Sequence, residues 1–378
     1  MSKKKSCFFK LNQNLQFFLI LSVDYNQMKK LIIFSVFFPF LSLGQTGGKS
    51  AYPFLNLTQN ARAGGIGNDL ITVYDDDINL GVLNPAVLNT TMSHSIAANQ
   101  SLLAGGIYHG MFVYGHDIKN LGTGAIHLRY LSYGKMDRMD ETGERLGSFT
   151  AGDFALGASL GRELNPHISI GGAFNFIWSQ LETYSSFGIS LDLAGTYKTL
   201  DKNTIISAVV RNIGTEIKPY RKGVRSPLPI NVMLGISHKL SHAPFRFSII
   251  YHHLNKWDLT YFDPNQKPKI DPLTGESMPL DGAKFIEKLG RHFIFQVESK
   301  IANVFSLRLG FDYNRRKEML VANRPGIGGF SFGVGLSLKR FAVDYGFSAF
   351  SSAGYHNMIT FRTNINTWRK KGGVPASE

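Results

Sequence analysis

Residues 304–314 read VFSLRLGFDYN and carry the alternation that decides the fold. Apolar and aromatic side chains occupy every second position from Phe305 to Tyr313, and small or polar side chains stand between them. Successive side chains of a β-strand point to opposite faces, so this pattern predicts a strand with one apolar and one polar face. One strand cannot reveal whether the apolar face meets a protein core or lipid, and the rest of the chain has to decide.

Segments of this kind, each about ten residues long, recur from residue 93 to residue 366. That length is sufficient for a tilted strand to cross a bilayer. We expect fourteen strands, at about 93–101, 105–115, 121–132, 152–162, 167–178, 185–197, 203–213, 230–240, 244–254, 291–301, 304–314, 329–339, 341–350 and 355–366.

The connections between these strands alternate between short and long. The long ones are residues 133–151, 214–229, 255–290 and 315–328, and short links of a few residues separate them. Outer-membrane barrels have short periplasmic turns and long extracellular loops, whereas a soluble β-sandwich has no reason to alternate in this way. An even number of strands also places both termini of the chain in the periplasm.

The composition agrees with this interpretation. The chain has 39 Gly and 29 Phe but only 18% charged residues, as expected of an all-β protein rich in turns. We therefore predict an all-β fold, a transmembrane outer-membrane β-barrel of about 14 antiparallel strands over residues 93–366, with its apolar faces towards lipid. The alternative is a soluble periplasmic β-protein.

The N-terminus predicts export. Residues 28–44 have a basic start, a short apolar run and small residues before Gly44, so we expect a signal peptide cleaved after about Gly44. The apolar run is too short for the alternative, a membrane anchor. We interpret residues 1–27 as a mis-called upstream extension, with Met28 as the true start. The one cysteine, Cys7, would be removed with it, so the exported chain would contain no disulfide.

The formal net charge is +14, with basic residues dispersed along the chain. In an exported protein this distribution favours anionic outer-membrane lipid, including lipopolysaccharide, over nucleic acid as the acidic neighbour. Residues 367–378 are predicted to form a basic periplasmic tail.

Residues 45–92 lack the strand pattern. They contain a stretch of small residues from Ala61 to Gly67, and two short motifs. One motif is the acidic run of Asp75, Asp76 and Asp77, and the other is the sequence Asn84, Pro85 and Ala86. The segment resembles that of the FadL superfamily of outer-membrane barrels, whose N-terminal segment forms a hatch inside a fourteen-stranded barrel and carries a comparable Asn-Pro-Ala element. The resemblance implies that residues 45–92 form a hatch in the lumen.

A second resemblance covers essentially the whole exported chain. The succession YPFLNL (52–57), ARAGGIGN (61–68), DDDINLGVLNPAVL (75–88), FVYGHDI (112–118) and the loop around 262–276 is similar to that of the PorQ family of the type IX secretion system. It implies a component of the cell-surface attachment complex that works with a sortase-like protein, a polysaccharide-binding partner and PorV. Its implied role is to anchor a partner, without catalysis.

Charged residues at inward positions of the predicted strands predict a filled, polar lumen. The candidates are Arg129, Arg308, Asp312, Asp344 and Arg362. The aspartates at 75–77 could bind calcium, but three consecutive carboxylates cannot all face one ion. We favour a hatch turn whose carboxylates bond to lumen arginines or cap backbone amides.

The loop at 255–290 is the candidate for partner contact, because it is too long for a plain turn and rich in aromatic, proline and charged residues. Its candidate residues are Trp257, Tyr261, Phe262, Asp263, Pro264 and Asp271. The alternative is a surface loop without a partner. We expect residues 133–151 to form a charged hairpin tip with a weaker claim to function.

Sequence motifs for catalysis are missing: there is no HExxH, P-loop or CxxC. The string GxSxG occurs at 157–161 and 329–333, but both copies fall inside predicted strands and not at the strand-to-helix turn that a nucleophile elbow needs. His252 and His253 would point to opposite faces of an ideal strand and could not share a metal. We therefore predict a non-enzymatic protein without cofactor or metal. Two functions remain: a surface-complex scaffold, or a FadL-type transporter of hydrophobic small molecules, which would need an apolar tunnel through the lumen.

Overall fold

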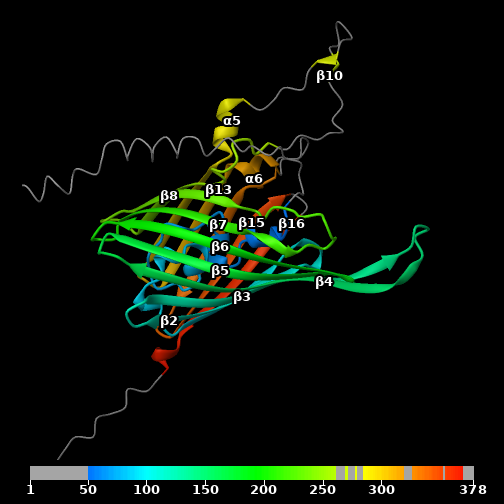
Figure 1. Ribbon diagram of the computed structural model, residues 1–378. Coiled ribbons are helices and arrows are strands. Elements are labelled where there is room, and N and C mark those ends of the chain that lie inside the picture. The colour runs from blue at the N-terminus through cyan, green and yellow to red at the C-terminus, as the bar shows by residue number, and fades with distance from the viewer. Residues whose placement is uncertain are drawn as a thin grey trace, which may run out of the picture. The chain divides into compact units, whose positions relative to one another are not determined.

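A computed structural model describes residues 50–260, 269–270, 277–278, 284–318, 326–351 and 354–368. Fourteen antiparallel strands form a closed barrel, and β1 pairs with β16 to complete the ring (Figure 1). Each strand otherwise pairs with its neighbours along the chain, with β9 next to β12. The predicted number of strands and their antiparallel arrangement are therefore confirmed.

The barrel strands lie close to their predicted positions. They are β1 (Ser95–Leu102), β2 (Tyr108–Ile118), β3 (Gly122–Met139), β4 (Arg145–Glu163), β5 (Ile168–Leu181), β6 (Tyr184–Lys198), β7 (Thr204–Lys218), β8 (Asn231–Lys239), β9 (Phe245–Tyr251), β12 (Phe293–Ile301), β13 (Phe305–Asp312), β14 (Phe330–Ser337), β15 (Phe341–Ser351) and β16 (Gly354–Asn364).

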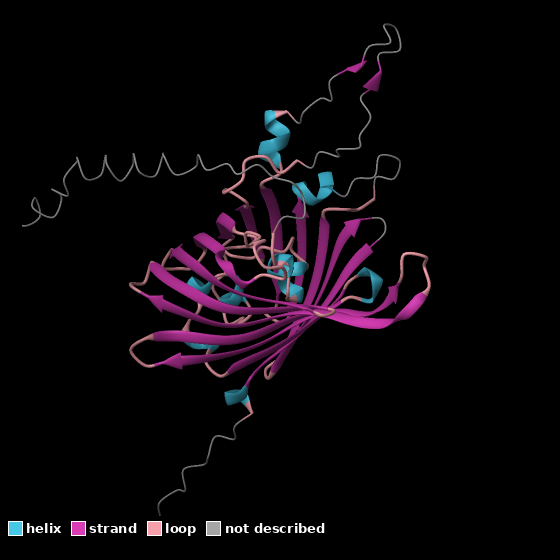
Figure 2. Ribbon diagram, turned by 45° about the vertical axis from the view of Figure 1, so that its right-hand side comes forward, coloured by secondary structure: helices cyan, strands magenta, loops and turns pink. Residues whose placement is uncertain are grey.

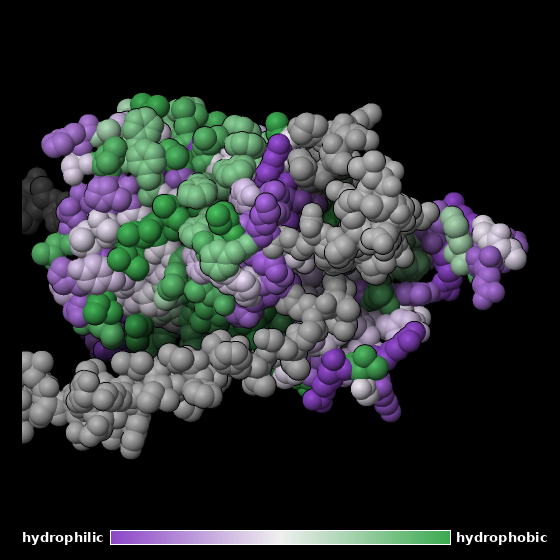
Figure 3. Space-filling view, turned by 90° about the horizontal axis from the view of Figure 1, so that it is seen from above, coloured by the Kyte–Doolittle hydropathy of each residue, from purple (hydrophilic) through white to green (hydrophobic). Residues whose placement is uncertain are grey.

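Strand β13 answers the question raised by the stretch at 304–314. Leu307 and Leu309 are 43% and 44% exposed on the outer wall, whereas Ser306 and Arg308 are buried towards the lumen. Apolar side chains likewise cover much of the wall seen in Figure 3. An apolar wall that faces outward is typical of a barrel surrounded by lipid. The strand ends earlier than predicted, because the chain turns into the short helix α6 (Tyr313–Glu318).

The long connection at 133–151, expected to form a charged hairpin tip, is mostly strand, so β3 and β4 are longer than predicted. β3 and β4 continue past their neighbours, and the ladder between them extends to the pair Met139–Arg145. The neighbouring ladders stop at Ser132 and Ala151, so the hairpin projects beyond the barrel wall (Figure 1).

The two ends of the barrel differ. At the short-turn end, few residues connect β2 to β3, β4 to β5, β6 to β7, β8 to β9, β12 to β13 and β14 to β15, and the chain also enters and leaves the barrel there. The other end, the long-loop end, carries the pair β10 (Lys269–Ile270) and β11 (Ser277–Met278), with helices α5 (Phe285–Gly290) and α6. Among the described residues, no helix is both long and apolar enough to cross a membrane.

The segment before β1 lies inside the ring of strands, where Figure 2 shows its short helices. Its helical elements are η2 (Pro53–Asn56), α3 (Ala61–Gly64), α4 (Leu80–Leu83), η3 (Pro85–Val87) and η4 (Thr90–Met92). Its apolar side chains form their own buried cluster, with Leu70, Leu80 and Leu83 at its centre and Ile205 of β7 against it. We call residues 50–92 the hatch.

Candidate functional site

The hatch backbone lies directly on glycines of the barrel wall. A Cβ atom added to Gly310 of β13 would overlap the carbonyl group of Ile66, and one on Gly346 of β15 would overlap that of Ala61. A Cβ on Gly65 would likewise lie 2.6 Å from the Cα of Gly333 in β14. Glycine is needed at such positions because only it allows two backbones to approach this closely. These contacts hold the hatch against β13, β14 and β15.

The Asn-Pro-Ala turn holds the hatch against the opposite wall. The Asn84 side chain accepts a hydrogen bond from the Ala86 amide at 2.9 Å and donates to the Ile71 carbonyl at 2.7 Å and to Thr196 of β6 at 3.1 Å. Pro85 occupies the first turn of η3, where its missing N–H costs nothing. The turn therefore has the rigid, hatch-positioning geometry that the sequence suggested.

Six charged side chains form a closed ring of alternating sign between the hatch and the wall. Arg62 of the hatch binds Glu298 of β12 through two hydrogen bonds of 2.9 Å. Glu298 also accepts from Arg308 at 2.9 Å, and Arg308 donates to Asp344 at 2.7 Å. Charge-assisted bonds of this kind are roughly twice as strong as neutral ones.

The ring closes through Asp77, its second residue from the hatch. Arg362 of β16 lies 3.1 Å from Asp344 and 3.5 Å from Asp77, and Asp77 lies 3.4 Å from Arg62. With three guanidinium groups and three carboxylates, the ring is neutral although its side chains are at least 85% buried. Each charge in it depends on the others, because a single buried charge without partners would be strongly unfavourable.

The three aspartates at 75–77 have different roles. Asp77 belongs to the ring, and Asp75 is bound to Arg62 at 2.8 Å outside it. Burial raises the pKa of Asp75, but the charge and hydrogen bond of Arg62 outweigh it and bring the pKa to about 2. Asp76 is exposed and forms no ion pair within the described part of the chain.

The five predicted lumen residues all point inward, but only three of them enter the ring. Arg129 instead donates to Asn175 of β5 at 3.0 Å, and Asp312 caps α6 by accepting from the Arg315 amide at 3.1 Å. Sequence reasoning missed Arg62 and Glu298. The signal for Arg62 was available, since it is the one arginine between residues 45 and 92.

Further bonds fix the hatch around the circumference of the barrel. These are Asp69 to Arg211 at 2.5 Å, Ala61 to Thr360 at 2.8 Å, Thr72 to Ser237 at 2.6 Å, Asn79 to Asn99 at 2.8 Å and Ala51 to Pro227 at 2.9 Å. Because these contacts involve β1 and β16 on one side of the barrel and β7 and β8 on another, the hatch is held as part of the barrel structure.

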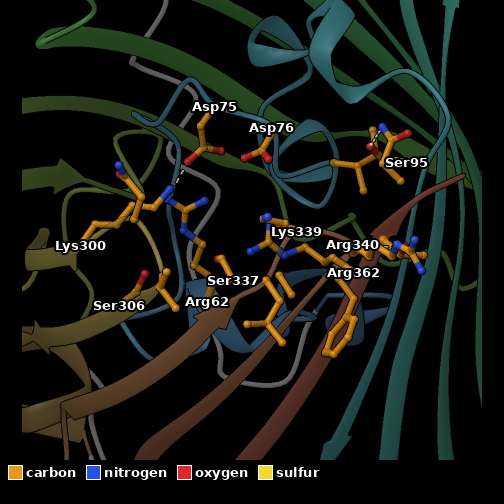
Figure 4. Close-up of a pocket in the computed structure, with 18 of the residues that line it drawn as sticks. Arg62, Asp75, Asp76, Ser95, Lys300, Ser306, Ser337, Lys339, Arg340 and Arg362 are labelled. Carbon is orange, nitrogen blue, oxygen red and sulfur yellow. Dashed lines mark hydrogen bonds and ion pairs between the residues drawn. The ribbon is translucent and has the colours of Figure 1, made fainter. Parts of the chain in front are cut away.

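A cavity of about 640 Å³ opens between the hatch and the short-turn end, and we call it the vestibule (Figure 4). The ring forms its floor through Arg62, Glu298, Arg308 and Arg362. Figure 4 shows Asp75 and Asp76 on one side and Lys339 and Arg340 on the other. Hydroxyl and amide side chains complete the lining, among them Ser95, Ser306, Ser337, Thr363 and Asn364. The size lies within the range of ligand-binding pockets.

At the long-loop end, Trp257 is the predicted partner-contact residue that the structure describes. Its ring lies 5.4 Å from Phe285 of α5 and 5.8 Å from His292 by centroid distance. An ion pair of 2.6 Å between Asp258 and Lys288 holds α5 beside it. The other candidates, Tyr261, Phe262, Asp263, Pro264 and Asp271, lie outside the described residues, as do residues 1–49 and 369–378.

The prediction that the His252 and His253 side chains point to opposite faces was wrong. β9 ends at Tyr251 and His253 takes a left-handed φ of 55°, so the two rings lie 4.7 Å apart instead of pointing to opposite faces. The described residues nevertheless contain no group of three or more side chains suited to hold a metal ion.

This chain is similar to known proteins in structure. No protein-family model matches the chain, and a search of curated proteins found no match. The toluene transporter TbuX of Ralstonia pickettii superimposes with a TM-score of 0.50 at 11% identity, over 82% of this chain and 99% of TbuX. The toluene transporter TodX of Pseudomonas putida gives 0.48 at 13% identity, over 81% and 97%.

A FadL homologue of Pseudomonas aeruginosa gives a TM-score of 0.46 at 12% identity, over 82% of this chain and 98% of the homologue. At identities this low, the similarity concerns the fold. The chain thus has a FadL-like outer-membrane barrel fold with its N-terminal segment in the lumen.

Proposed function

We propose that this chain is a non-enzymatic outer-membrane barrel of the type IX secretion system that anchors a partner of the cell-surface attachment complex. In this proposal the short-turn end faces the periplasm and the long-loop end faces the cell surface, as in other outer-membrane barrels. The signal peptide at 28–44 would deliver the chain to the outer membrane.

The observation that carries the proposal is the fixed hatch. The hatch contacts wall glycines through its backbone, and a neutral buried ring of charges joins it to β12, β13, β15 and β16. Displacing it would separate Arg62 from Glu298 and Asp77 from Arg362, which is strongly unfavourable. A barrel with its lumen occupied in this way suits a rigid support for other proteins better than a conduit.

The long-loop end supplies a surface for such a partner. Phe285 and Ile286 of α5 are 66% and 80% exposed, and Trp257 is 47% exposed next to them. Exposed aromatic groups on a positioned helix are typical of protein interfaces. The partner classes come from the resemblance to the PorQ family: a polysaccharide-binding surface protein, a sortase-like protein and PorV.

The alternative is a FadL-type transporter of hydrophobic small molecules, and TbuX, which has this fold, is a toluene transporter. Such a protein needs an apolar path through the lumen. The vestibule instead has nine charged lining residues, and its floor is a ring of ion pairs. This lining favours the scaffold over the transporter.

Deleting residues 258–288 tests the site of partner contact. The barrel should still insert and show heat-modifiable migration, while capture of the surface partner from the native outer membrane should fail. A matched control replaces residues 137–148 of the projecting hairpin by Asn-Gly, and it should retain capture. Intact capture after the 258–288 deletion would show that the long loop is not the docking site.

A further inference from the structure

The vestibule has three cationic side chains without carboxylate partners among the described residues. The ring and Asp75 already neutralise Arg62, Arg308 and Arg362. Lys300, Lys339 and Arg340 line the same cavity, and none of them forms an ion pair within the described part of the chain.

Contacts with Trp368 and Thr363 hold Arg340 in place. Its guanidinium group lies 5.1 Å from the ring centroid of Trp368, and its carbonyl oxygen accepts a hydrogen bond of 2.7 Å from Thr363. Trp368 in turn donates to Thr363 at 2.8 Å. A stacked guanidinium loses less side-chain freedom on binding than a free one. Asp76 is the one carboxylate of the lining, among the described residues, without an ion pair.

The cations are spaced along the rim instead of converging on one point. Lys300 lies near the end of β12, whereas Lys339 and Arg340 lie in the turn after β14, with β13 between. At a strand spacing of about 4.8 Å, the backbones that carry the two groups lie roughly 10 Å apart along the rim. Three residues of extended peptide span a similar distance, about 10 Å.

The rest of the lining also fits a peptide. Val304, Leu338 and Phe341 provide apolar surface between the cations, and hydroxyl and amide groups surround them. Hatch residues line the inner side of the cavity, so a segment would enter from the short-turn end.

We propose that the vestibule binds an extended acidic peptide segment, with carboxylates two to three residues apart, presented by a soluble protein at the short-turn end. Lys300 contacts one carboxylate, and Lys339 and Arg340 contact the next. This site is separate from the long-loop surface, and the inference does not depend on a type IX partner.

The test is binding of fluorescein-labelled hexaglutamate to the purified full chain in neutral detergent, followed by fluorescence anisotropy. We expect saturable binding that weakens with salt. An exposed charge pair contributes about threefold in affinity, so the variant Lys300→Gln/Lys339→Gln/Arg340→Gln should bind roughly 30-fold more weakly. All three side chains lie at the rim, and the heat-modifiable migration of the variant should match that of the parent.

The matched control removes three exposed cations at the other end, in Lys135→Gln/Lys222→Gln/Arg225→Gln. It should change the affinity by less than twofold. Asp76→Asn should tighten binding by about threefold, because it removes a like charge. A purely structural role for Asp76 would not produce this gain.

Three results would overturn the proposal. The first is an absence of binding to hexaglutamate at millimolar concentration. The second is an equal loss in both triple variants, which would indicate general attraction to a basic protein. The third is displacement of the peptide by tripolyphosphate at the same concentration and with the same dependence on the three cations, which would make the vestibule a site for small anions.

Discussion

Replacement of Arg62 by glutamine tests whether the charge ring holds the hatch. The variant Arg62→Gln keeps a polar side chain of similar length but removes the one hatch cation in the ring. Three carboxylates contact Arg62: Asp75, Asp77 and Glu298. Without it, Glu298 would keep Arg308 and Asp77 would keep Arg362, whereas Asp75 would have no ion pair among the described residues. The strands and their ladders are untouched, so the barrel itself should still form.

The expected size of the effect follows from burial. The Arg62, Glu298 and Asp77 side chains are 8%, 9% and 0% exposed, so water can replace the lost partner only in small part. Removing one member of a buried ion pair typically costs 3–5 kcal/mol, or roughly a 100- to 3000-fold shift in the equilibrium between a seated and a released hatch.

A cysteine placed at Ala63 reports this equilibrium. Ala63 is 0% exposed in the hatch core, so a cysteine there should react with a bulky maleimide only when the hatch is released. In detergent micelles at pH 7, the modification rate should rise in Arg62→Gln by the factor given above. The double variant Arg62→Gln/Glu298→Gln should recover part of the protection, because it removes one of the uncompensated carboxylates.

Arg145→Gln is the matched control. Arg145 pairs with Asp137 on the projecting hairpin, where the two side chains are 64% and 40% exposed. Such pairs contribute little, and the modification rate should change by less than about fivefold. A rate for Arg62→Gln within threefold of the parent would refute the reasoning, since the ring would then not hold the hatch.

Three further outcomes are expected. Gly310→Val should lower the yield of heat-modifiable barrel and expose the cysteine placed at position 63, because any Cβ at Gly310 overlaps the Ile66 carbonyl group. The control Ser306→Ala lies on the same strand without that contact, and it should have neither effect. The ionised Asp75 side chain stabilises the seated hatch above the unfolded-state pKa of its carboxyl group, about 3.9. This stabilisation is lost as the pH falls through the folded-state pKa of about 2. Pepsin should therefore cleave the hatch faster at pH 2 than at pH 4. In planar bilayers the parent should give no steady conductance and Arg62→Gln should give intermittent openings; equal conductance in both would contradict a closed lumen.

The barrel could be predicted from the sequence because its signal is local. Each strand shows its own alternation of apolar and polar residues, as between Phe305 and Asp312. The alternating lengths of the connections distinguish the two ends of the barrel. A hairpin tip was expected at 133–151, but the length of its strands was not predicted, because glycines and charges dilute the alternation there; Met136 and Phe149 still pair across the ribbon.

The charge ring could not be predicted in the same way. Arg62 and Glu298 are 236 residues apart, and their contact depends on how the closed barrel and the hatch place them. The sequence suggested that the acidic run would meet lumen arginines, and Asp77 does meet Arg362. It could not show that Arg308 would instead join Glu298 and Asp344, because that choice depends on which inward positions share a level in the barrel.

The measurement that tests the central claim most directly is a detergent pull-down of the tagged chain from its native outer membrane, with co-purifying proteins and lipids identified by mass spectrometry. We expect a stoichiometric secreted surface protein as companion. A bound fatty acid or other apolar small molecule without any protein companion would contradict this expectation and favour transport.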